Sequence, residues 1–154
     1  MGKGKAMKAK AIQIRNAIFW VIIAIFAAMV VIIASQGRFL GHKLTIVVFA
    51  SLIITFSVLA AVLVVLTARV KEAFIRKLFF IVTGASAAGV LVFGILHNLV
   101  YGLCVKFGWV YWGEGGDEPV FFILALFVCP VLFFLGALGS IVLLIRAGLR
   151  KNAG

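Results

Sequence analysis

Acidic residues are scarce in this chain of 154 residues, which has four of them against 15 lysines and arginines. None of the four lies within a long apolar run. The chain therefore shows no paired carboxylates for acid–base catalysis, nor the carboxylate within the first span that small multidrug transporters require. No nucleophile with a neighbouring base and no phosphate-binding loop is visible either. We predict that the protein is not an enzyme.

Cysteine is almost as rare, with two residues, Cys104 and Cys129. They form no CxxC pair and no zinc-type spacing, which argues against a metal site and against the four-helix quinone reductases that oxidise thiols. By helical rise, Cys104 lies near the end of its helix, whereas Cys129 lies about 15 Å into the next one. A disulfide needs Cα atoms within about 7 Å of one another. Both cysteines are therefore predicted to be free thiols in a packed interior.

Long apolar runs dominate what remains. Hydrophobic residues make up 66% of the chain and charged residues 12%, and the mean hydropathy is +1.30. Four runs reach the ~20 residues that cross a hydrocarbon core, where lipid requires a helix. Short links predict antiparallel neighbours. The sequence thus predicts an all-α integral membrane protein, one domain over 1–154 with a four-helix antiparallel bundle, whose spans cover about 16–35, 44–67, 78–105 and 119–145.

Lysine and arginine predict the orientation of the spans. Twelve of the 15 lie in the basic tail 1–15, in Ala68–Lys77 and in the basic tail 146–154. The positive-inside rule then places both termini in the cytoplasm, with the plasma membrane as the expected location. Because these charges flank apolar spans and form no folded basic face, we expect contacts with anionic lipid headgroups and no nucleic-acid binding.

The connection 106–118 is rich in glycine, aromatic and acidic residues and is predicted to be external. Trp and Tyr favour the membrane–water interface, and both are frequent at interaction surfaces. The acids either bind a cation or a partner, or simply cap the next helix before Pro119; the sequence leaves both readings open. The candidate contact residues are Trp109, Tyr111, Trp112, Glu114, Asp117 and Glu118.

The third run holds the sharpest candidate for an intramembrane polar site. His97 is the one ionisable side chain expected well inside a span, and Asn98 and Tyr101 are near it. An ionisable group at that depth suggests a proton relay, an ion or ligand contact, or a haem ligand. The alternative is a neutral histidine that hydrogen-bonds within the bundle. A b-type haem protein is the third hypothesis. It is disfavoured because the other histidine, His42, is predicted in a loop and not in a span.

Small residues on one stripe of each span predict where helices meet, since close packing drives helix association in lipid. In the third and fourth spans the predicted packing residues are Ser86, Gly94, Ala125, Gly136 and Ser140. If these two spans begin and end at equal depth, His97 faces Cys129, which completes the candidate polar site. Pro130 is expected to kink the fourth helix and to free a carbonyl one turn earlier, because proline has no N–H to donate.

Taken together, the sequence favours a non-catalytic multi-pass membrane protein that acts through helix packing, as an accessory subunit or a self-associating bundle. Its expected partners are a second copy or another membrane protein, and no cofactor is predicted. The alternative is a small oligomeric channel or transporter that uses His97, Asn98 and Tyr101. A haem protein is the third reading.

Overall fold

The computed structural model describes residues 3–35, 42–108 and 119–152, and all the secondary structure in these ranges is helical. The elements are α1 (Lys3–Ala34), α2 (His42–Arg69), α3 (Phe74–Phe107), α4 (Pro119–Ile123), the π-helical segment η1 (Leu124–Val128) and α5 (Cys129–Asn152). The last three follow one another without a break. Four helical segments are long and apolar enough to cross a membrane. This confirms the predicted all-α class with four spans.

Three helices begin earlier than predicted, by two residues in α2 and by more in α1 and α3. α1 starts at Lys3, inside the basic segment that we took for an aperiodic tail. Its alanines and lysines are strong helix formers, so the helix extends beyond the apolar run without needing an apolar stripe. α3 starts at Phe74 rather than at residue 78. At its other end Gly108 adopts a left-handed conformation (φ 66°) and its N–H donates to the Cys104 carbonyl, which closes the helix.

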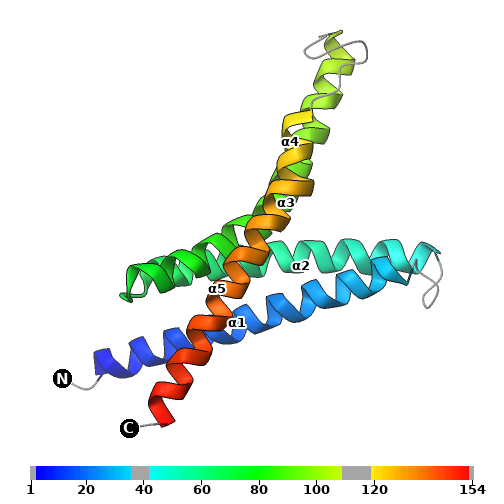
Figure 1. Ribbon diagram of the computed structural model, residues 1–154. Helices are drawn as coiled ribbons and strands as arrows, with labels where there is room; N and C mark the ends of the chain where they lie inside the picture. Colours follow the sequence, from blue (N-terminus) through cyan, green and yellow to red (C-terminus); the bar gives the residue numbers. More distant parts are fainter. Residues whose placement is uncertain (1–2, 36–41, 109–118, 153–154) are drawn as a thin grey trace.

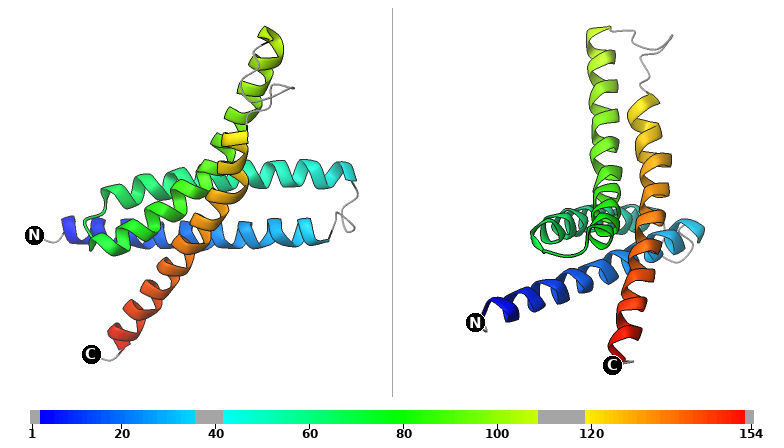
Figure 2. Two further views of the ribbon diagram at one scale, coloured as in Figure 1. Left: turned by 45° about the horizontal axis from the view of Figure 1, so that its top comes forward. Right: turned by 60° about the vertical axis from the view of Figure 1, so that its left-hand side comes forward.

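The helices form two antiparallel pairs that cross one another. α1 lies beside α2. The first part of α3 runs back along α2, and its distal part lies beside the α4–η1–α5 segment, which crosses the α1–α2 pair (Figures 1 and 2). α3 is the central element, since it contacts both α2 and α5 extensively. The side-by-side packing of all four helices that we predicted is not confirmed. The start of α1, the end of α5 and the α2–α3 connection lie toward the same side of the molecule (Figure 1).

Glycines let α2 and α5 pack closely against the first half of α3. A Cβ atom at Gly84 would lie 2.9 Å from the Ala60 carbonyl oxygen of α2, and one at Gly136 would lie 2.7 Å from the Thr83 nitrogen of α3. Small residues thus let both neighbours approach the α3 backbone. Four of the ten residues of the buried core cluster are phenylalanine, namely Phe19, Phe56, Phe80 and Phe133.

The surface of the described chain is strongly apolar. Large hydrophobic side chains on every spanning segment are exposed, with Val31, Val47, Val105 and Leu138 all about 60% accessible. A soluble monomer rarely exposes so continuous an apolar surface, whereas lipid-facing helices do. The four helices are therefore compatible with a multi-pass membrane protein.

The π-helical segment η1 lies immediately before Cys129-Pro130. The Cys129 N–H donates to the carbonyl of Leu124, five residues earlier, instead of the usual four. Proline at position 130 removes one further N–H from this region, so the wider turn accommodates the interruption. The helix is thus interrupted next to Pro130, in the form of a π-helical segment.

Candidate functional site

The distal part of α3, residues 90–107, contains the predicted intramembrane site. His97 is half-buried, and its ring centroid lies 5.5 Å from that of Phe122 in α4. Asn98 is exposed on a different side of α3, and its side-chain nitrogen donates to the Gly94 carbonyl at 2.8 Å. Tyr101 is 45% exposed. The Asn98 amide thus bonds back to its own helix, whereas the His97 ring contacts α4.

Cys129 does not join His97. A Cβ atom at Gly89 would lie 2.8 Å from the Cys129 sulfur, so the cysteine faces Gly89. Position 89 is about 12 Å along α3 from His97. The predicted pairing of His97 with Cys129 is wrong by eight residues, or about two turns. Both cysteines are buried free thiols, as predicted.

The shifted register has a physical cause. We assumed that the two helices end level with each other, but α3 extends beyond the start of α4 (Figure 1). The close contacts of Gly136 with Thr83 and of Gly139 with the Phe79 ring set the register instead. The segment that joins α3 to α4 has enough residues to run back over two turns of helix, so level ends are not required.

The predicted packing residues separate into two groups. Gly136 lies directly against Thr83, and Ser86, Ala125 and Ser140 are buried as well. The Ser86 hydroxyl donates to the carbonyls of Val82 and Thr83, at 2.6 and 3.1 Å. Gly94 differs, since a Cβ atom there would meet nothing within 4 Å. Gly94 is therefore an open position on this chain and packs against no helix described here.

Gly94 and Asn98 border a groove of about 580 Å³ between α2 and the distal part of α3. The groove exists because α3 leaves α2 beyond the crossing point. Gly84 and Gly102 are five turns apart and hence lie on the same face of α3. Gly84 meets α2, whereas Gly102 has open space. The lining residues are Ile53 of α2 and, from α3, Val90, Leu91, Gly94, Ile95, Asn98 and Leu99.

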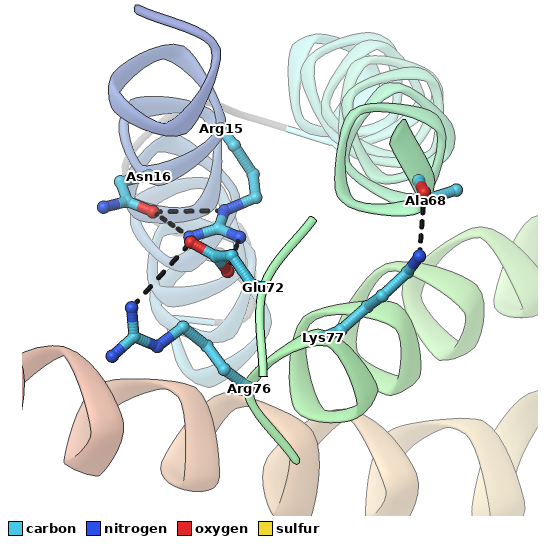
Figure 3. Close-up of polar contacts among 6 residues, drawn as sticks. All are labelled: Arg15, Asn16, Ala68, Glu72, Arg76 and Lys77. Carbon is cyan, nitrogen blue, oxygen red and sulfur yellow. Dashed lines mark hydrogen bonds and ion pairs between the residues drawn. The ribbon is translucent and has the colours of Figure 1, made fainter. Parts of the chain in front are cut away.

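A buried charge cluster that we did not predict joins α1 to the α2–α3 connection (Figure 3). Arg15 is 1% exposed and forms an ion pair with Glu72, whose side chain is 8% exposed. The guanidinium also donates to the Asn16 side-chain oxygen at 2.9 and 3.2 Å and lies 4.1 Å from the centre of the Phe80 ring. Arg76 approaches the second Glu72 oxygen at 3.8 Å.

These contacts connect α1 to the α2–α3 connection and to the start of α3. Arg15 is satisfied by charge, hydrogen bonds and an aromatic face together, so it can remain buried. It holds α1 against the start of α3, while Lys77 donates to the Ala68 carbonyl at 2.8 Å and closes the same connection (Figure 3). One signal was visible in the sequence, because Glu72 is the sole acid outside the 106–118 connection. Its partner Arg15 lies 57 positions away, and no local sequence pattern indicates that the two residues pair.

The six candidate contact residues of the external loop lie outside the described residues; they are Trp109, Tyr111, Trp112, Glu114, Asp117 and Glu118. Within the described ranges, no cluster of three His, Cys, Asp or Glu side chains could hold a metal ion.

Comparison with protein-family models, with curated proteins and with solved structures finds no match for this chain.

Proposed function

We propose that the protein is a non-catalytic multi-pass protein of the plasma membrane that works through helix contacts, and that it self-associates through the distal face of α3. This face consists of Gly94, Asn98 and Gly102, which are spaced four residues apart and therefore follow one side of the helix. Both glycines have open space above them, and Asn98 is exposed. The proposal rests on Asn98, a polar side chain on a lipid-facing surface.

The amide chemistry favours a second copy as the partner. The bond from Asn98 to the Gly94 carbonyl uses one N–H group. An amide has a second N–H donor and an oxygen that accepts, and hydrocarbon can satisfy neither. Across a two-fold axis, two Asn98 side chains can donate to one another reciprocally. The glycines above and below would let the two backbones come close enough for this exchange.

Removing the amide should weaken self-association. An interhelical hydrogen bond in a membrane contributes about 1–2 kcal/mol, so Asn98→Leu is expected to raise the dimer dissociation constant about tenfold. Gly94→Leu should weaken it further by blocking close approach. The measurement is energy transfer between labelled copies in vesicles over a series of protein-to-lipid ratios. Val92→Leu is the matched control, because Val92 is 51% exposed on another side of the same helix. Equal transfer in all four proteins would refute the proposed interface.

The proposed orientation has both termini and the α2–α3 connection in the cytoplasm, where the basic side chains can contact anionic headgroups. It is supported by the excess of lysine and arginine in these segments, including Arg69, Lys71 and Arg146. We expect a fluorescent protein fused after residue 154 to fluoresce in cells, and alkaline phosphatase fused at the same position to stay inactive. The same two reporters inserted in the 106–118 connection should behave in the opposite way. An active phosphatase at the C-terminal end would reverse the assignment.

A further inference from the structure

A small cavity lies where all four spanning segments cross. Its volume is about 120 Å³. Met29, Phe56, Ser57, Ala87 and Phe133 are its buried lining residues. Phe26, Ile53, Val90 and Pro130 are half-buried and complete the wall. Every one of the four segments thus contributes to the lining.

The cavity persists because its wall cannot collapse into it. The rings of Phe26, Phe56 and Phe133 contact one another, with centroid separations of 4.8, 5.6 and 6.3 Å. Three mutually packed rings move little, since each blocks the others. On the opposite side Ala87 is fully buried and has no side chain beyond Cβ that could fill the space. The cavity therefore follows from packing large rings against a small residue at a helix crossing.

The chemistry of the residues that line the cavity determines which kind of molecule can bind in it. The Ser57 hydroxyl is the one polar side-chain group in the wall. A buried water needs two to four polar partners, which this wall does not provide. An apolar cavity of ~150 Å³ in a protein interior stays dry and takes up benzene or xenon. We propose that the cavity at the helix crossing is a binding site for small uncharged apolar molecules, up to about the size of benzene.

The groove beside α3 provides the way in. Ile53 and Val90 line both the groove and the cavity, so the two spaces are adjacent. The groove has a mostly apolar lining, to which apolar solutes dissolved in a membrane can bind. We expect a solute to enter the cavity from the groove, past the side chains of Ile53 and Val90.

Methionine methyl groups give a direct test. Met29 lines the cavity, whereas Met7 lies in the basic part of α1 and is 74% exposed. In protein labelled with ¹³C at its methionine methyls and held in lipid nanodiscs, xenon pressure should shift the Met29 signal along a saturating curve. The Met7 signal should not follow that curve, and benzene should reverse the Met29 shift by competition. A Met29 signal that stays fixed, or that moves linearly with pressure as dissolved gas would cause, would overturn the proposal.

A pair of matched variants locates the site. Ala87→Leu places three more carbons in the cavity and should abolish the saturating shift at Met29. Ala85→Leu makes the same change on the exposed side of α3 and should leave the shift intact. A saturating shift that survives Ala87→Leu would place the bound xenon elsewhere and overturn the assignment. If Ala87→Leu does not fold, the contrast between Met29 and Met7 in the unmodified chain decides the matter.

Discussion

Replacing Arg15 with methionine is expected to lower the free energy of unfolding by about 3 kcal/mol. Removing one partner of a buried ion pair costs about 3–5 kcal/mol, because the remaining charge is left in a low-dielectric interior. We expect the lower end of this range, since Arg76 stays 3.8 Å from Glu72 and partly compensates its charge. SDS titration of the protein in mixed micelles, followed by tryptophan fluorescence, measures the loss.

Two further variants make this test specific. Arg146→Met removes an exposed arginine from α5 and should change the free energy of unfolding by less than about 0.5 kcal/mol. The double variant Arg15→Met with Glu72→Gln should be more stable than Arg15→Met alone, because it no longer buries an unpaired carboxylate. If Arg15→Met unfolds like Arg146→Met, the ion pair does not hold α1 in place.

Gly136→Ala is expected to destabilise the protein by about 1–3 kcal/mol, the usual cost of overpacking. The added methyl would lie 2.7 Å from the Thr83 nitrogen and 3.1 Å from its Cα. Relief requires the α5 and α3 backbones to separate, since a main-chain atom cannot rotate away. The Gly148→Ala control on the same helix meets nothing within 4 Å and should be neutral or stabilising by up to ~1 kcal/mol. The same SDS titration measures both, and equal effects would contradict the close α3–α5 contact.

The helices were predictable from the sequence because lipid leaves the backbone few alternatives. Four apolar runs of sufficient length had to be helical, and Pro130 had to disturb its helix. Helix ends were less predictable. The Lys/Ala-rich stretch before residue 15 has no apolar period and was taken for a tail, although its residues favour a helix.

The candidate site was harder to predict because it depends on which neighbour each face meets. Gly94 and Gly136 are the same residue type on comparable stripes, yet Gly136 contacts Thr83 whereas Gly94 has open space. The difference arises from the crossing of the helix pairs, which periodicity does not encode. The Arg15–Glu72 pair spans 57 positions and is likewise invisible to any local pattern. His97 could be found as an unusual residue, but its neighbour Phe122 could not be named without the register.

The central claim is that two copies meet through the distal face of α3, and disulfide trapping in membranes tests it most directly. In a background with Cys104→Ala and Cys129→Ala, a cysteine is placed at Ile95, beside Asn98, or at Leu103, on another side of the helix. Both positions are exposed, at 57% and 40%, so an oxidant can reach each of them. A disulfide forms where Cα atoms approach within about 7 Å. We predict that Ile95→Cys gives a covalent dimer and Leu103→Cys a monomer. The account is contradicted if Ile95→Cys stays monomeric, or if both positions cross-link equally.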